Sequence, residues 1–281
     1  MLTQLEAYSS WESAPVLPLS DNGREETDLI QIRGCTGLDP VKATINTSPF
    51  GSVDGVAFTG ATLPTGRNIV LTLHPNPDWK NWTYESLRRL VYSYFMPKLL
   101  TRLVFRSNDM PPVEIYGYVE DCNVNQFASD IEIQVSIICP DPYFTAVDAT
   151  VITDRTSNGT TPLSVQYDGS VEAGINVEVD RFSDPGPTFI AIQIGEQIIS
   201  YYRVAATVDA TKYFVMNSIP GSKYVRNVTW NTGVITNLLP KLQQGSQWPT
   251  LKPGENDFSV ITDTPGNQDF RLTYFERYGG L

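Results

Sequence analysis

The sequence has little cysteine and a single histidine, and this narrows the chemistry that it can support. Cys35, Cys122 and Cys139 form no CxxC pair, and their odd number predicts neither a disulfide framework nor a zinc site. His74 stands at the end of an expected strand and precedes Pro75. Any Ser–His–Asp or Cys–His catalytic arrangement would have to use this histidine, and a structural or exposed histidine is the more frequent case.

Common catalytic and nucleotide-binding motifs are absent as well. The sequence contains no GxGxxG, Walker, GxSxG or HExxH pattern. A glycosidase needs only two carboxylates, but the adjacent Glu120 and Asp121 are expected on opposite faces of one strand. We therefore assign no catalytic, cofactor-binding or metal-binding residue. The sequence predicts a protein that is not an enzyme and that needs no cofactor.

Positive charge is also sparse. The 281 residues include 20 Lys and Arg against 31 Asp and Glu, which gives a formal net charge of −11, and no basic cluster of five or more residues occurs. This disfavours specific DNA or RNA binding and predicts a solvated acidic surface that nucleic acid could pass without adhering. The first fifteen residues lack the pattern of a signal peptide, and no apolar run of about 18 residues predicts a membrane span.

Strand-forming patterns dominate what the sequence does contain. Alternating apolar residues over 113–119 and 131–137 predict two half-buried strands, which the segment DCNVNQFAS joins into a long hairpin. If Glu120 lies opposite Asp130 in this hairpin, Cys122 and Cys139 are roughly 30 Å apart and remain thiols. Further strands are expected at 69–74, 102–106, 175–180, 188–194, 197–203, 212–217, 257–262 and 270–276.

One segment predicts a helix. From Thr83 the chain reads TYESLRRLVYSYFMP, in which an apolar residue recurs at the spacing of one helical face, at Leu87, Leu90, Val91 and Tyr94. Thr83 is the expected N-cap, Trp82 before it is expected to pack on Leu87, and Pro97 is expected to end the helix. Arg88 and Arg89 lie off the apolar face, where solvent is the default surrounding and a partner subunit is the alternative.

The segment CPDPYF predicts a domain boundary, because prolines cannot donate to a central ladder. We expect an N-terminal β domain with one helix over 1–144. A β-sandwich is expected over 145–281, where short strands alternate with turn signals. The second half also holds several aromatic residues, which more often fill a core or an interface than stack on a sugar. They are Tyr201, Tyr202, Tyr224, Trp230 and Trp248.

Several segments in this order resemble one known family. These are DPVKATINTSPFGSVDGVAFTGATLPTGRNIVLTL from Asp39, ICPDPYF from Ile138, VEAGINVEVD from Val171, LKPGENDFSV from Leu251 and the terminal FRLTYFERYGGL. They are similar to the distal tail (Dit) proteins of long-tailed bacteriophages. The likeness covers most of residues 28–144 and touches the second half in patches.

The resemblance implies a structural protein of the phage tail tip or baseplate in the virion, assembled in the host cytoplasm. It implies a ring, typically a hexamer, formed by a barrel-like or sandwich-like N-terminal domain related to tail tube proteins. The C-terminal domain is expected to be a galectin-like β-sandwich. The expected partners are sister copies, the tail tube protein, and tip or receptor-binding proteins, with DNA passing through a central channel without specific binding. The loop 51–66 is a candidate for reaching a neighbouring subunit.

Two other functions stay open at this stage. A carbohydrate-binding adhesion protein of the tail tip would need exposed aromatics beside polar groups on a sandwich face. A tail tube subunit would stack into long cylinders, whereas a distal tail ring stays discrete. A tail-tip enzyme is the alternative least supported, because the site motifs are missing.

Overall fold

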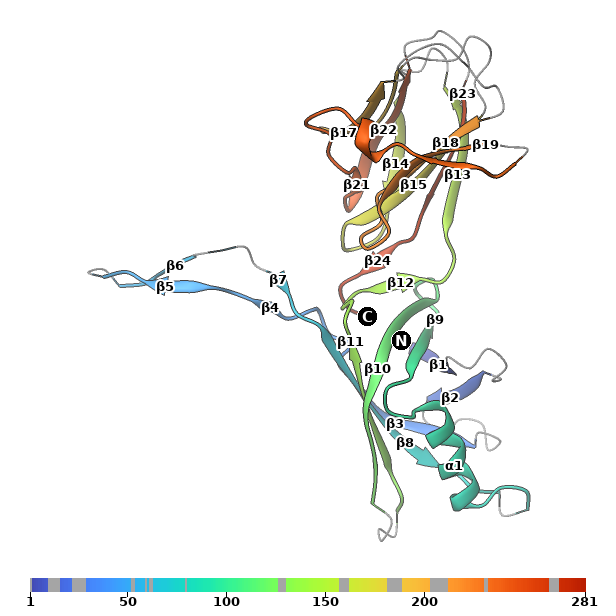
Figure 1. Cartoon of the computed structure of the whole chain (residues 1–281). Coiled ribbons are helices and arrows are strands. Elements are labelled where there is room, and N and C mark those ends of the chain that lie inside the picture. Colours follow the sequence, from blue (N-terminus) through green and yellow to red (C-terminus); the bar gives the residue numbers. More distant parts are fainter. Residues whose placement is uncertain are drawn as a thin grey trace. The chain divides into compact units, whose positions relative to one another are not determined.

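The computed structural model describes residues 2–9, 16–21, 29–51, 54–58, 60, 63–78, 80–125, 130–156, 162–180, 189–202, 212–229, 232–262 and 268–281. The chain forms two compact units, Met1–Val147 with Tyr278–Leu281, and Asp148–Arg277. Strands dominate both units, as the sequence predicts (Figure 1). Among the described residues, no helix is long and apolar enough to cross a membrane.

The first unit is built on a barrel-like sheet. Its strands follow the order β11-β8-β3-β2-β1-β9-β10-β12-β24, and an additional pairing of β10 with β11 brings the sheet back on itself. Only β2 and β3 pair in parallel among the registers described here. The bounds are β1 (Leu2–Ser9), β2 (Leu17–Asp21), β3 (Ile30–Thr36), β8 (Arg67–Pro75), β9 (Leu100–Ser107), β10 (Val113–Val124), β11 (Ile133–Cys139), β12 (Phe144–Ala146) and β24 (Arg277–Tyr278).

The alternating side chains of this sheet make the core of the first unit. Every second residue of β8 and β11, and of β10 from Val113 to Val119, is buried, as in the run Ile133, Val135 and Ile137. This confirms the alternation expected over 113–119 and 131–137. Burial of these aliphatic side chains is the main force that closes the sheet, at about 1.5–3 kcal/mol for each.

The register of the β10–β11 hairpin differs from the expected one. Val119 lies opposite Ile137 and Cys122 opposite Val135, with an irregularity between Val119 and Asp121. The pairing of Glu120 with Asp130 was wrong, because β10 continues to Val124 and the shift falls inside the strand. In this register Cys139 lies beside Gly117, about 16 Å along the strand from Cys122. All three cysteines are free thiols, which agrees with the prediction made for Cys122 and Cys139.

The helix α1 (Tyr84–Tyr94) begins after the predicted cap and buries Leu87, Val91 and Tyr94 of the predicted apolar face, while the packing of Trp82 on Leu87 stays a prediction. Thr83 is the N-cap: its hydroxyl accepts from the Ser86 amide at 3.3 Å, and the Ser86 hydroxyl accepts from the Thr83 amide at 2.8 Å. Leu87 and Val91 are buried, and the helix lies against β1 and β8. It ends at Tyr94, three residues before Pro97.

The second unit is a sandwich of two antiparallel sheets. One follows the order β13-β23-β15-β18-β19-β20, with β21 paired to β15, and the other follows β14-β22-β16-β17. Their inner faces share one core, which includes Val177 and Phe270 from the first sheet and Ile192 and Phe258 from the second. The bounds are β13 (Thr150–Thr156), β14 (Leu163–Tyr167), β15 (Ala173–Val179), β16 (Phe189–Ile194), β17 (Gln197–Tyr202), β18 (Lys212–Asn217), β19 (Tyr224–Thr229), β20 (Ile235–Asn237), β21 (Thr250–Leu251), β22 (Gly254–Thr262) and β23 (Gln268–Tyr274), with a 3-10 turn at Leu239–Lys241.

Each of the eight isolated segments that the sequence marks as strands overlaps a strand of the structure. Others lacked a clear pattern and were not expected, among them β1, β2, β3, β13, β14 and β19. In β3 the burial does not alternate cleanly, because a register shift between Ile32 and Gly34 interrupts its pairing with β8. A strand with such an interruption does not show the period of two on which sequence patterns depend.

Candidate assembly site

An exposed two-stranded arm lies between residues 43 and 64 of the first unit. It consists of two ribbons, β4 (Ala43–Thr44) with β7 (Leu63–Pro64), and β5 (Thr47–Pro49) with β6 (Val56–Phe58). Among the described residues, these strands pair only with each other, and the arm extends away from the barrel-like sheet (Figure 1). An isolated two-stranded ribbon is marginally stable in water, so the arm is suited to gain stability from a neighbour.

The arm carries large apolar side chains that face solvent. Ile45, Phe50, Val56 and Phe58 have exposed fractions between 52% and 71%. Burial of four such side chains against a partner would contribute about 6–12 kcal/mol to association, at about 1.5–3 kcal/mol each. The entropic cost of ordering the arm and these side chains is to be subtracted from that figure. Four large exposed apolar side chains between residues 45 and 58 make the arm a candidate interaction surface.

A buried arginine holds the root of the arm. Arg67, at the start of β8, donates Nε to the Pro142 carbonyl at 2.7 Å and Nη1 to the Asp39 carbonyl at 2.8 Å. Its guanidinium donates further to the carbonyls of Gly37 and Gly279. Burial lowers the pKa of this guanidinium from its ordinary value, but arginine remains charged at any physiological pH.

An aromatic ring completes the surroundings of Arg67. The Cζ atom lies 4.5 Å from the centroid of the Phe144 ring, a cation–π arrangement, and Phe144 packs edge-on against Phe105. The N–H groups of Arg67 donate to carbonyls of residues that lie 28 to 212 positions away from it in the sequence. These include RNIVLTL, ICPDPYF and the terminal segment, which carry the family resemblance.

The last residues of the chain, Gly279 to Leu281, bond to the base of the same arm. The Val41 amide donates to the Gly279 carbonyl at 3.1 Å, and the Leu281 amide donates to the Leu38 carbonyl at 3.0 Å. A Cβ atom added at Gly280 would lie 2.8 Å from the Pro40 nitrogen, so only glycine fits there. On the other strand, Thr65 donates its amide to the Lys42 carbonyl at 3.0 Å. Both strands of the arm thus leave from a fixed base.

A second exposed apolar cluster lies on the outer face of the barrel-like sheet. Tyr118 of β10 pairs with Leu100 of β9 on one side and with Ile138 of β11 on the other. These three residues and Tyr116 have exposed fractions of 37–49%. Beside them, the half-buried Arg102 and Glu114 form an ion pair. We call Leu100, Tyr116, Tyr118 and Ile138 the outer-face patch.

The residues considered for catalysis do not assemble into a site. His74 lies with Nδ1 3.2 Å from the Ile131 carbonyl and 3.2 Å from Asp130 Oδ1, a contact between chain segments. Glu120 and Asp121 are both exposed, and the irregularity in β10 falls at this point. Their carboxylates accept from different partners, Ser136 and Asn123.

The remaining candidates have ordinary structural surroundings. Arg89 pairs with Glu85 one turn earlier on the helix, at 3.0 Å, and both side chains are exposed. Trp248 is half-buried against the core of the second unit, with the Lys223 ammonium 5.6 Å from its ring, and Tyr224 lies 4.1 Å from the guanidinium of Arg226. Trp230 and the side chains of Tyr201 and Tyr202 lie outside the described residues. Sequence patterns did not reveal Arg67, whose role depends on distant carbonyls.

A barrel-like unit with an exposed apolar arm, joined in sequence to a sandwich unit, defines a fold class, that of mostly β proteins with two units. No family model and no curated protein matches the chain. Among solved structures, the Dit (gp 19.1) protein of phage SPP1 is similar, with a TM-score of 0.65 and 17% identity over 97% of this chain and 98% of that one. The phage P2 baseplate in its activated conformation matches with a TM-score of 0.49 and 10% identity over 97% and 98%.

The SPP1 protein is described as a paradigm of the hub adsorption apparatus in phages that infect Gram-positive bacteria. Over nearly its whole length, this chain has the fold of that Dit protein. The expectation of a Dit-like, mostly β fold is confirmed at the level of the fold.

Proposed function

We propose that this chain is a distal tail protein, a structural component of a phage tail tip in which copies close into a ring. The likeness to the SPP1 Dit protein over 97% of the chain supports this proposal. The resemblance of the segments around Arg67 to the same family adds an independent argument from sequence. The proposed role is structural and not enzymatic, and the protein acts in the virion after assembly in the host cytoplasm.

The exposed apolar arm is the observation that supports the proposed ring. Ile45, Phe50, Val56 and Phe58 are exposed on ribbons that have no other sheet partner in the described part of the chain. We assign the neighbouring copy as their occupant. Because the arm is one surface and the outer-face patch is another, each copy can give an arm on one side and receive one on the other. Such heterologous contacts close into a ring when the rotation between copies allows it.

The ring size and its neighbours follow from the family resemblance. Six copies would surround a channel through which DNA passes, between the tail tube protein on one side and tip or receptor-binding proteins on the other. The net charge of −11 for each copy suits a channel that repels DNA and so does not retain it. In this proposal residues 1–144 make the ring, and the galectin-like sandwich of residues 145–281 offers a docking surface.

The test measures oligomeric state in the full-length protein by native mass spectrometry and negative-stain electron microscopy. The wild type is expected to form discrete rings. Val56→Asp, in the arm, is expected to give monomers, because each contact would bury a charge without a partner. Val234→Asp is the matched control, since Val56 and Val234 are 56% and 58% exposed and Val234 lies in the second unit.

Three outcomes would contradict the proposal. If the wild type is monomeric at high concentration, the protein does not form the proposed ring. Long tubes would indicate a tail tube subunit instead. Rings that persist in Val56→Asp as in Val234→Asp would show that the arm does not make the contact.

A further inference from the structure

The arm carries a single charged side chain. Between residues 43 and 64 the sequence contains one residue of the types Asp, Glu, Lys and Arg, and that residue is Asp54. Asp54 lies in the turn that joins β5 to β6, it is exposed, and its carboxylate has no hydrogen bond or ion pair within the described part of the chain. A carboxylate that a neighbour covers without a partner of opposite charge is costly. The surface that receives the arm therefore needs a cation beside its apolar groups.

The apolar side chains that follow and precede Asp54 share one side of the ribbon. Val56 is paired with Pro49, and Phe58 is paired with Thr47, across β5 and β6. Paired residues point to the same side of a ribbon, and residues two apart along a strand do so as well. Pro49, Val56 and Phe58 are all exposed and therefore form one apolar surface, which we call the arm face.

The outer-face patch has the complementary composition. Leu100, Tyr118 and Ile138 form one row across β9, β10 and β11, and their side chains are 37–49% exposed. Lys98 stands two residues before Leu100, and its amide donates to the Val119 carbonyl at 3.3 Å, which holds Lys98 beside β10. The patch thus offers apolar side chains with an ammonium group at its rim.

Lys98 is a cation of this surface without an ion pair. Arg102 is paired with Glu114, whereas the exposed Lys98 has no ion-pair partner within the described residues. Lys98 also has a φ of 74°, and it is the one non-glycine residue with positive φ in the described part of the chain. A lysine in this conformation carries a backbone cost that glycine would not carry, and such costs collect at functional sites.

We propose that the outer-face patch of one copy receives the arm face of the next copy, with Asp54 paired to Lys98 across the interface. This inference rests on the proposed ring and names the surface that each arm occupies. The apolar contact supplies affinity, and the ion pair fixes the position of the arm on the patch, because electrostatic complementarity sets register more than strength. The pair occurs once at every interface, since each copy gives one arm and receives one.

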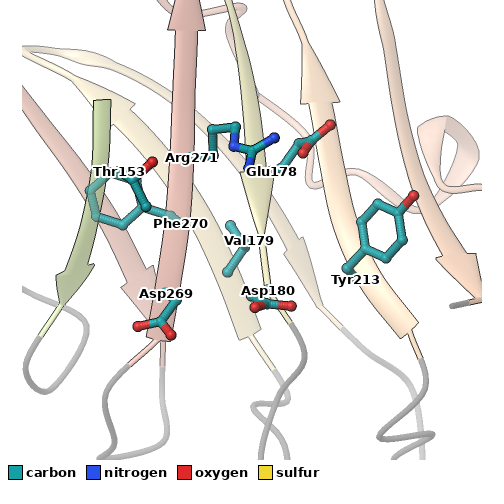
Figure 2. Close-up of a pocket in the computed structure, with 8 residues that line it drawn as sticks. All are labelled: Thr153, Glu178, Val179, Asp180, Tyr213, Asp269, Phe270 and Arg271. Atoms are coloured by element: carbon teal, nitrogen blue, oxygen red, sulfur yellow. The ribbon is translucent and has the colours of Figure 1, made fainter. Parts of the chain in front are cut away.

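A hollow on the second unit fits the arm less well. It lies on the sheet of β13, β23, β15 and β18, and Figure 2 shows the side chains of Glu178, Asp180, Asp269 and Arg271 that line it. Asp180 and Asp269 already have interaction partners. Three carboxylates against one guanidinium also repel a segment whose single charge is negative. The charge of the arm therefore favours the outer-face patch.

Charge reversal in the full-length protein tests the pair. Mass photometry over a dilution series measures the protein concentration at which half of the chains are in rings. Asp54→Lys and Lys98→Asp each place like charges at the interface and are expected to raise this concentration at least about tenfold at low salt. The double variant, which carries both changes, restores opposite charges and is expected to return it to within about threefold of the wild type. At about 1 M salt, where the screening length is about 3 Å, the effect of each single reversal should shrink.

Matched controls separate the pair from a general effect of charge. Asp257→Lys and Lys252→Asp change exposed residues of the second unit and alter the net charge by the same amounts, so neither is expected to change ring assembly. Ile138→Asp in the patch is expected to prevent rings, whereas Leu239→Asp in the second unit should not, although the two side chains are 38% and 37% exposed. Circular dichroism of each variant verifies that the chain is folded.

Chemical cross-linking reads the contact directly. A water-soluble carbodiimide joins a carboxylate to an ammonium group that lies in contact with it, so it is expected to join Asp54 to Lys98. In rings assembled from unlabelled and nitrogen-15-labelled copies, the linked peptide should carry both isotopes, which shows that the bond joins two copies. Lys98→Arg keeps the positive charge and should still form rings, but it should lose the cross-link.

Failure of this inference differs from failure of the ring. If the wild type forms no rings, the proposed function fails and this inference fails with it. If the wild type forms rings and Val56→Asp does not, the ring stands. The inference alone is then overturned when the two reversals assemble like Asp257→Lys and Lys252→Asp, or when the double variant stays as impaired as the single ones. A cross-link of unmixed isotopes, or rings in Ile138→Asp as abundant as in Leu239→Asp, would also overturn it.

Discussion

Replacing Arg67 with methionine tests the idea that one buried guanidinium holds the root of the arm. The variant keeps the length of the side chain and loses the donors to the carbonyls of Gly37, Asp39, Pro142 and Gly279. Each hydrogen bond from a charged donor contributes about 1.5–3 kcal/mol, so four of them contribute about 6–12 kcal/mol. Removing the charge recovers several kcal/mol of desolvation cost. The expected net loss in the free energy of unfolding is about 3–5 kcal/mol.

In the thermal transition of the first unit, this loss corresponds to a fall in Tm of about 6–20 °C, at about 2–4 °C per kcal/mol for a unit of this size. Differential scanning calorimetry of the full-length protein measures it. The transition of the second unit is expected to stay in place. The Tm of the first unit in Arg67→Lys should lie between those of the wild type and Arg67→Met. A lysine ammonium is a point charge and cannot reach all the carbonyls that the planar guanidinium joins.

Arg33→Met is the matched control on the neighbouring strand β3. Arg33 pairs with Asp130 and Glu132, but all three side chains are 41–55% exposed. A surface pair of this kind contributes about 1 kcal/mol or less. If Arg67→Met lowers the Tm of the first unit by no more than Arg33→Met does, the four carbonyls do not depend on Arg67 and the reasoning fails.

Two further predictions concern the C-terminal tail and the thiols. Gly280→Ala should destabilise the first unit by about 1–3 kcal/mol in chemical denaturation, whereas Gly51→Ala, which has open space around it, should change little; equal effects would contradict the close packing at Pro40. Burial raises the pKa of Cys35 and Cys139 to about 12, and burial with the charge of Asp121 raises that of Cys122 to about 11. Because folding favours the protonated thiols, this contribution to stability is complete below the unfolded pKa of about 9 and is lost as the pH rises from there toward 12. A thiol reagent at pH 8 should therefore react slowly with the native protein and fully in guanidinium chloride; rapid labelling of the native protein would refute this.

The local parts of the fold could be read from the sequence because their signals are local. Alternation between buried and exposed residues marked the hairpin of β10 and β11, and an apolar face with a threonine cap marked α1. The scarcity of histidine and basic residues, and the missing catalytic motifs, favoured a structural role over catalysis or nucleic-acid binding. None of these inferences needs to know which segments meet in space.

The hairpin register and the arm could not be read in this way. The expected register placed the turn directly after Glu120, but β10 continues to Val124, and a one-residue irregularity after Val119 shifts the later pairs once more. Segment 51–66 was expected as a loop, but Val56–Phe58 and Leu63–Pro64 within it form strands that pair back with Thr47–Pro49 and Ala43–Thr44.

Composition and periodicity are properties of the chain that act over a few residues, so they were sufficient for the mostly β fold class, whereas the expected kind of protein came from the resemblance of particular segments to one family. Arg67 has its role only through neighbours that are distant in the sequence. The guanidinium needs four carbonyls from three chain segments, those of Gly37 and Asp39, of Pro142 and of Gly279. Long-range packing settles such contacts, because each is a small free energy that appears only after the whole sheet has formed.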